Sequence, residues 1–281
     1  MIAPRLLVEN ITIPTPRGSK RTAWQYHSRS DRHSKVACWG VMVDLLATSA
    51  MLRDHARAGK VVFGVNHEMR DFKQNRSKNL DLVIARPAGD QAQSQGQTLM
   101  ELADSWSLYV SPGDRDLIQQ LPIIREGTVG PVLVALEAKA AMTEHSKARP
   151  RLFDELNSSH LTVHGASSRA LAVGLVIVNA STTFISPGRN PDPSVAANIT
   201  KHKQPKAVVD VIDKVKELPR RTQPDQAGFD ALSIIVVTCA NDGSVVTVET
   251  APPAPQPGDI FEYQQSIARL ASEYDTTFSN I

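Results

Sequence analysis

Residues 132–139 read Val-Leu-Val-Ala-Leu-Glu-Ala-Lys, a short apolar run that ends in a carboxylate and an ammonium group. In a β-strand, side chains two residues apart lie on the same face. We therefore expect Glu137 and Lys139 to point the same way from a strand whose other residues suit burial. Burying charge is costly unless the charge is paired or serves a ligand, so this stretch is the first candidate for a functional site.

A second acidic residue interrupts another apolar strand. Residues 79–84 read Asn-Leu-Asp-Leu-Val-Ile, with Asp81 between two leucines. Aspartate is disfavoured inside strands because it is costly to bury and competes for backbone hydrogen bonds. An outward-facing Asp81 is the simpler interpretation, but apolar neighbours on both faces indicate a strand that is buried on both sides. Asp81 and Glu137 would form one site if their strands were neighbours.

The composition is that of an ordinary globular protein. The 281 residues allow one large domain or two small ones. The formal net charge of +2 does not indicate nucleic-acid binding, which would have to rest on local clusters. The two cysteines, Cys38 and Cys239, exclude a disulfide scaffold and a Cys-rich zinc site and fit a reducing cytoplasm. No signal-peptide pattern and no apolar run of ~18 residues is present, so we expect a cytoplasmic protein without membrane contact.

Hydrophobic periodicity predicts an alternation of helices and strands. Apolar residues spaced by three and four predict helices over residues 35–58, 98–106, 114–121, 149–159, 205–218 and 259–274. Apolar runs and alternation predict strands over residues 61–67, 80–85, 132–139, 170–180 and 231–238, with a hairpin partner at 244–248. This order predicts an α/β fold with a central mixed β-sheet flanked by helices.

The chain is expected to fall into three parts. Residues 1–33 read as an N-terminal arm, with a possible edge strand at 6–13, that is either simply solvated or touches phosphates through its basic residues. Residues 34–250 form the main domain, in which 86–130 is a long insertion with structure of its own. Residues 251–281 form a proline-rich spacer and a C-terminal helix.

The residue types at the two strands suit phosphodiester hydrolysis. A divalent metal stabilises the charge that develops on the phosphate and generates hydroxide near neutral pH. Mg²⁺ prefers a few carboxylate oxygens together with water and substrate phosphate. A nearby lysine can orient the attacking water or help to deprotonate it. Asp81, Glu137 and Lys139 meet these requirements if the two strands are adjacent.

The order of elements and these residues together resemble the PD-(D/E)xK nuclease superfamily, the fold of many type II restriction endonucleases. The motif would be Asp81 followed by Glu137-Ala138-Lys139, and the resemblance covers residues 35–180. It implies that Asp81 and Glu137 bind Mg²⁺, that the backbone carbonyl of Ala138 is a further ligand, and that Lys139 assists the attacking water. Leu80 stands where the motif has its first-letter proline.

Basic residues flank both halves of the expected site. Such side chains would hold backbone phosphates, although solubility explains any one of them alone. The flanking residues are Arg76, Lys78, Lys147, Arg149 and Arg151.

Two further residues near the motif allow alternative roles. His145 fits either a phosphate contact or an ordinary polar loop. Glu68, at the end of the preceding strand, is an additional candidate metal ligand, although a solvated carboxylate is the simpler interpretation.

These observations predict a Mg²⁺-dependent endonuclease acting on double-stranded DNA, of restriction or anti-phage type. A homodimer is expected because a two-fold protein matches the two strands of a duplex. The alternative is a nuclease-like DNA-binding subunit of a defence complex without its own cleavage activity. A third class, a small-molecule α/β enzyme, would instead have a deep apolar pocket and no basic surface around Asp81.

Overall fold

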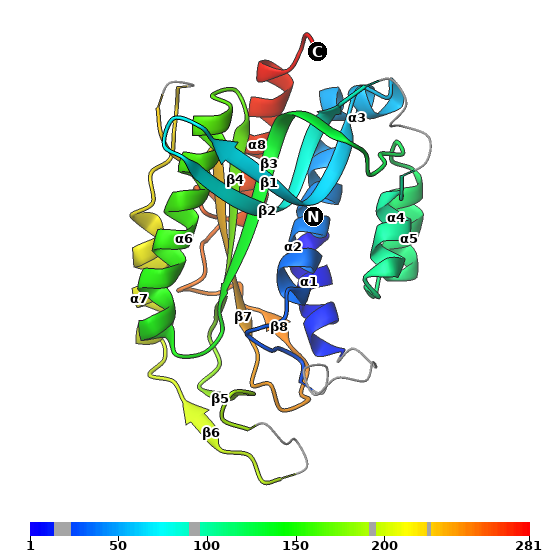
Figure 1. Cartoon of the computed structure of the whole chain (residues 1–281). Coiled ribbons are helices and arrows are strands. Elements are labelled where there is room, and N and C mark those ends of the chain that lie inside the picture. Colours follow the sequence, from blue (N-terminus) through cyan, green and yellow to red (C-terminus); the bar gives the residue numbers. More distant parts are fainter. Residues whose placement is uncertain (14–23, 90–95, 191–194, 224–225) are drawn as a thin grey trace.

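The computed structural model describes residues 1–13, 24–89, 96–190, 195–223 and 226–281. Its centre is a six-stranded mixed sheet in the order β1-β2-β3-β4-β7-β8 (Figure 1). The strands are β1 (Val62–Asp71), β2 (Arg76–Pro87), β3 (Val129–Ala141), β4 (Leu171–Asn179), β7 (Ala231–Thr238) and β8 (Thr247–Val248). Strands β3, β4 and β7 are parallel, and the other neighbours are antiparallel. The predicted α/β class with a central mixed sheet is confirmed.

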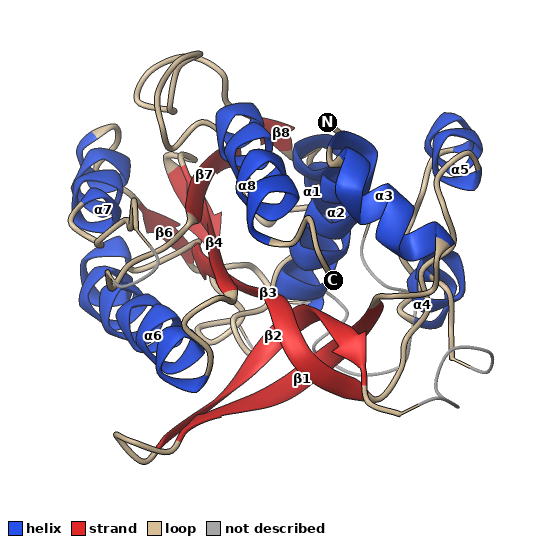
Figure 2. Cartoon of the chain, turned by 90° about the horizontal axis from the view of Figure 1, so that it is seen from above, coloured by secondary structure: helices blue, strands red, loops and turns tan. Residues whose placement is uncertain are grey.

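Helices cover both faces of the sheet (Figure 2). One face carries α6 (His145–Ala166) and α7 (Lys206–Lys216), and the other carries α1 (Ala3–Thr12), α2 (Arg32–Thr48) and α8 (Tyr263–Thr277). Because both faces are covered, every residue of β4 is buried, as expected for a parallel strand at the centre of a sheet. A separate two-stranded sheet, β5 (Thr183–Ile185) with β6 (Ile199–Lys201), lies where a polar loop was predicted.

The N-terminal segment differs from its prediction. Residues 3–12 form helix α1 rather than an edge strand, and Leu6 and Leu7 are fully buried in the core. A short apolar run does not distinguish a strand from a buried helix by its pattern alone, and Pro4 suits the first turn of a helix. This part of the chain is therefore packed into the domain and is not an arm. The basic part of the expected arm at residues 14–23 lies outside the described residues.

Several element boundaries also shift. The helix predicted over residues 35–58 is two helices, α2 and α3 (Ala50–Arg57), which bend by 96° at Ser49. Ser49 accepts the Leu52 N–H and caps the second helix. Helix α6 begins at His145, earlier than expected, and continues to Ala166. No single helix among the described residues is both long enough and apolar enough to cross a membrane.

The predicted insertion contains two short helices, α4 (Leu99–Ser105) and α5 (Pro112–Gln119), as expected. They pack beside α2, where the Trp39 indole donates to the Leu99 carbonyl at 2.8 Å. Helix α8 buries its apolar face within the chain, through Tyr263, Leu270 and Tyr274. The C-terminal helix therefore does not offer that face to a second subunit.

Asp44 joins three of these elements. It is 3% exposed, and its carboxylate accepts the backbone N–H groups of Ile2 and Ala3 at 2.7 and 3.0 Å and the Tyr263 hydroxyl at 2.8 Å. Asp44 has a structural role, because its carboxylate on α2 satisfies the free N–H groups at the start of α1.

We expect Asp44→Ala to lower the free energy of unfolding by about 3 kcal/mol, because buried donors to a charged acceptor lose their partner. Urea denaturation followed by circular dichroism measures this change. The exposed Asp116 provides a matched control, Asp116→Ala, which should unfold like the wild type. Equal stability of the two variants would show that Asp44 does not anchor α1.

Candidate functional site

Strands β2 and β3 separate at the positions of Asp81 and Glu137. They pair through residues 82–87 of β2 and 129–136 of β3. Beyond this stretch, residues 76–80 of β2 pair with β1, and residues 137–141 of β3 pair with β4. Because Leu82 lies opposite Leu136, Asp81 and Glu137 occupy the next opposing positions, at the fork between the strands. The two halves of the predicted motif are thus brought together.

The backbone is irregular at Asp81. Leu80 packs into the core beside α6, whereas Leu82 packs into the core beside α2, although residues two apart normally share a face. In the neighbouring strand, Asn66 has a positive φ of 49° between the residues that pair with Leu80 and Leu82. The alternation of faces therefore breaks at Asp81.

At this break, the Asp81 carboxylate turns toward β3. It accepts a hydrogen bond from the Ala138 backbone N–H at 2.9 Å. This bond replaces the backbone hydrogen bond between β2 and β3 that is lost where the two strands separate. A strand residue directs its C=O to the same side as its N–H, so the Ala138 carbonyl also points into the fork.

Glu137 and Lys139 lie side by side, as the strand alternation predicted. Their charged groups are 2.7 Å apart, and Lys139 also lies 3.4 Å from the Glu155 carboxylate on α6. Lys78 lies 3.7 Å from Glu137 and donates to the Glu155 carbonyl. Glu137 is 3% exposed, and its Oε2 atom is buried without a hydrogen-bond partner among the described residues. One carboxylate oxygen therefore remains available at the fork.

Burial makes the ionised form of both carboxylates unfavourable. It raises the pKa of Asp81, although the Ala138 N–H and Lys139 oppose the shift. Burial and the neighbouring charge of Asp81 likewise raise the pKa of Glu137, against Lys139 and Lys78. The two nearby lysines therefore compensate the negative charge of each carboxylate only in part.

The two lysines respond differently to this site. Burial disfavours the charge on Lys139, but Glu137 and Glu155 outweigh it, so the pKa of Lys139 is raised. Burial lowers the pKa of Lys78. The charge of Glu137 opposes this shift only in part, and the positive charge of Lys139 adds to it. Lys139 is therefore held as an ammonium group, while Lys78 is the more easily deprotonated of the pair.

The first turns of α2 complete the surroundings of the site, which the sequence did not indicate. The Ser34 hydroxyl helps to stabilise charge on Asp81. Burial, followed by the charge of Lys139, lowers the pKa of His33 to about 4. Burial and then the two carboxylates raise the pKa of Cys38 well above its usual range. A helix periodicity places Ser34 and Cys38 on one face, but only the fold shows that this face meets Asp81.

The available groups fit a hard divalent cation. Two carboxylates and one backbone carbonyl point into the fork, and Mg²⁺ usually takes a few such oxygens and completes its shell with water and phosphate. The unpartnered Oε2 atom of Glu137 and the raised pKa values of both carboxylates indicate a site that lacks positive charge. No group of three or more His, Cys, Asp or Glu side chains forms a complete ligand set within the described part of the chain.

The other predicted residues divide between two places. Lys78 belongs to the site, and Arg151 lies next to it, with its Nε atom 3.7 Å from Glu155. Arg76 lies at the start of β2 opposite Asp71, toward the tip of the hairpin. Glu68 is exposed on β1 opposite Asn79 and lies outside the contacts that join the motif residues.

His145, Lys147 and Arg149 lie in the first turns of α6, whereas Glu155 lies in the middle of this helix. His145 bonds to the carbonyl of Asn179, five residues beyond Gly174, which is the β4 partner of Glu137. Five residues of strand span ~16 Å. The expectation that these three residues lie beside the acidic pair is therefore wrong. Helix α6 begins only after β3 has ended at Ala141, so its first residues lie beyond the far end of that strand.

Comparison of the chain with protein-family models, with curated proteins and with solved structures found no match. The residues at the fork, Asp81, Glu137 and Lys139, are therefore the observations from which a function can be inferred.

We expect Asp81→Asn to raise the melting temperature near neutral pH in metal-free buffer. The folded-state pKa of Asp81 is raised, so its charge costs stability above that pKa, and the cost disappears as the pH falls below the unfolded value. The asparagine oxygen can still accept the Ala138 N–H. The gain over wild type should therefore shrink toward about pH 4.

Thermal melts over this pH range, with Asp116→Asn as the exposed control, measure the effect. A variant that melts below wild type at neutral pH would contradict the assignment of Asp81 as an electrostatically unfavourable carboxylate.

Proposed function

We propose that the protein is a Mg²⁺-dependent endonuclease that hydrolyses phosphodiester bonds in double-stranded DNA, of restriction or anti-phage defence type. The observation that carries this proposal is the fork, where Asp81 and Glu137 meet beside Lys139 and one carboxylate oxygen is unpartnered. An ion-pair network built only for stability would pair each buried charge more completely.

The residues of the fork would have separate roles in hydrolysis, some as metal ligands and one as a cation beside the attacking water. Asp81, Glu137 and the Ala138 carbonyl would hold the cation, which when bound supplies charge for the phosphate and acidifies a water molecule. Lys139, held as an ammonium group, would orient the attacking water and stabilise charge on the phosphate rather than remove a proton. The water oxygen bonds to phosphorus and loses a proton to solvent. The bond from phosphorus to one sugar oxygen breaks, and that oxygen leaves with the electron pair and takes a proton from solvent.

The wider parts of the proposal rest on general arguments. A homodimer would present two such sites to the two strands of a duplex. A cytoplasmic location fits the two buried cysteines, Cys38 and Cys239, which are free thiols. Lys78 and Arg151 lie at or beside the fork and would hold the phosphates next to the scissile bond, while Arg76, toward the hairpin tip, would hold one farther away.

We expect Lys139→Met to lower the rate of plasmid cleavage in Mg²⁺ by about a hundredfold or more, because an interaction with the developing charge is lost. Methionine keeps much of the side-chain volume, so the fold should be retained. Lys60→Met, at an exposed lysine before β1, is the matched control and should cleave like the wild type.

Equal cleavage by Lys139→Met and wild type would rule out the catalytic assignment. Intact DNA binding with no cleavage by the wild type in Mg²⁺ or Mn²⁺ would instead favour the alternative of a nuclease-like binding subunit.

We expect Mg²⁺, Mn²⁺ or Ca²⁺ to raise the melting temperature of the wild type, because a ligand at a hundred times its Kd stabilises the folded state by about 2.7 kcal/mol. Asp81→Asn and Glu137→Gln should largely lose this response, and it should weaken at lower pH as protons compete for the carboxylates. Glu68→Gln tests the remaining candidate ligand and should keep the full response. An equal metal response in all four proteins would exclude the fork as the cation site.

A further inference from the structure

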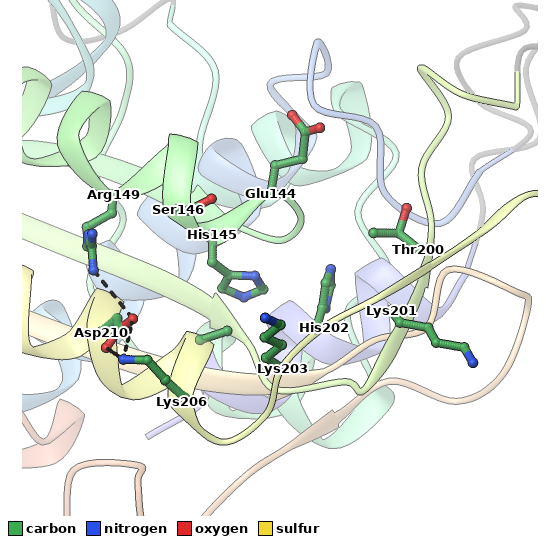
Figure 3. Close-up of a pocket in the computed structure, with 11 residues that line it drawn as sticks. Glu144, His145, Ser146, Arg149, Thr200, Lys201, His202, Lys203, Lys206 and Asp210 are labelled. Carbon is green, nitrogen blue, oxygen red and sulfur yellow. Dashed lines mark hydrogen bonds and ion pairs between the residues drawn. The ribbon is translucent and has the colours of Figure 1, made fainter.

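A second site lies at the carboxyl end of β4, apart from the fork. It is a pocket of about 250 Å³ between the first turns of α6 and α7 and the short strand β6 (Figure 3). Its wall contains His145 and Arg149 from α6, His202 and Lys203 from the segment after β6, and Lys206 from α7. The pocket therefore gathers basic groups from two parts of the chain that are distant in sequence, residues 145–149 and residues 201–206.

The two imidazole rings have defined tautomers. His145 Nε2 bonds to the Asn179 carbonyl at 2.8 Å, and His202 Nδ1 bonds to the Ser181 carbonyl at 2.9 Å. A carbonyl only accepts, so each of these nitrogens carries a hydrogen atom. The remaining nitrogens, Nδ1 of His145 and Nε2 of His202, have no hydrogen-bond partner within the described residues. On protonation each becomes an N–H donor.

These two rings lie at the pocket as a pair. Their centroids are 4.7 Å apart at an interplanar angle of 81°, and His145 is only 5% exposed. Figure 3 shows both rings and Lys203 lining the same space. The Nε2 atom of His202 is buried without a hydrogen-bond partner among the described residues, an arrangement that is costly unless a ligand supplies the missing partner.

The remaining charges also favour an anion. The carboxylates that line the pocket already have cationic partners: Asp210 pairs with Lys206 and Arg149, and Glu144 with Lys147 and Arg189. Lys203 is exposed and has no carboxylate partner in the described part of the chain. Helix α6 begins here without a side-chain cap hydrogen bond from its N-cap residue, whereas the Gln204 side chain accepts the Val208 N–H at the start of α7. The N-termini of helices attract anions, phosphate above all.

The distance between the pocket and the fork follows from two elements. Along β4, Asn179 lies five residues beyond the partner of Glu137, or ~16 Å. Along α6, His145 precedes Glu155, the partner of Lys139, by ten residues, or ~15 Å. The two estimates agree, and each corresponds to about five base steps along the axis of a duplex.

We propose that this pocket binds a phosphate group of the nucleic acid that the fork cleaves, at a distance from the scissile bond. The inference rests on the proposed nuclease function for the identity of the ligand. The phosphate accepts hydrogen bonds from Lys203 and from the free N–H groups at the start of α6, and the imidazole rings of His145 and His202 line the same space. The pocket positions the nucleic acid and takes no part in bond cleavage.

The experiment uses the full chain and short fluorescent duplexes, with and without a 5′-phosphate, in Ca²⁺ at several salt concentrations. Lys203→Glu should weaken binding about tenfold and reduce the slope of log K against log salt by roughly one, because one phosphate contact is lost. His202→Gln replaces a neutral imidazole by a neutral amide and should weaken duplex binding less than Lys203→Glu does. Lys60→Glu makes the same change in net charge away from the pocket and should keep the wild-type slope.

The two duplexes distinguish the sources of the phosphate. Equal weakening on both indicates an internal phosphodiester, and weakening only on the 5′-phosphorylated duplex indicates a terminal phosphate; either result supports the pocket. Unchanged affinity and slope for Lys203→Glu on both duplexes, or no binding of either duplex by wild type, overturns it. Absence of cleavage alone would overturn the nuclease function and leave this result standing, because binding is measured without turnover.

Discussion

A buried carboxylate, Glu137, and a half-buried one, Asp81, lie where two strands of a β-sheet separate, and the surrounding structure compensates their charge only in part. Asp81 lies where β2 leaves β3, and its carboxylate takes over a backbone N–H that lost its strand partner. Glu137 lies beside it with one oxygen unpartnered. Burial raises the pKa of both groups, so the ionised form of each is disfavoured in the folded protein. Such local cost is typical of functional sites, where a ligand supplies the missing charge.

The rest of the fold keeps this site rigid. Strand β3 pairs with both β2 and β4 over residues 134–136 and with β4 alone over residues 137–141, so the motif lies on the central strands of the sheet and not on a loop. Helix α6 provides Glu155 from one face, and α2 provides Ser34 from the other. Because α1 and α8 hold α2 in place through Asp44, the N-terminal helix contributes indirectly to the position of the site. Preorganised charges on rigid elements are more effective than mobile ones.

Sequence reasoning succeeded where the pattern was strong and local. The buried strands and the shared face of Glu137 and Lys139 followed from apolar runs and strand alternation, whereas the placement of Asp81 beside Glu137 was expected only from the resemblance to the nuclease motif. It failed for α1, because ten residues of mixed apolar pattern fit a strand or a helix equally. It also misplaced His145, Lys147 and Arg149, because closeness in sequence to Lys139 was taken for closeness in space. His33 and Cys38 had no local signal at all, since their role depends on how α2 packs on the sheet.

Helix α6 links the two sites directly, with Glu155 at the fork and His145 at the basic pocket. A single continuous helix is stiff, and its length is set by residue number alone at 1.5 Å per residue. If both sites act on one nucleic acid, α6 serves as a molecular ruler. The offset between the phosphate that is gripped and the bond that is cut would then be built into the fold, independent of any base that the protein reads.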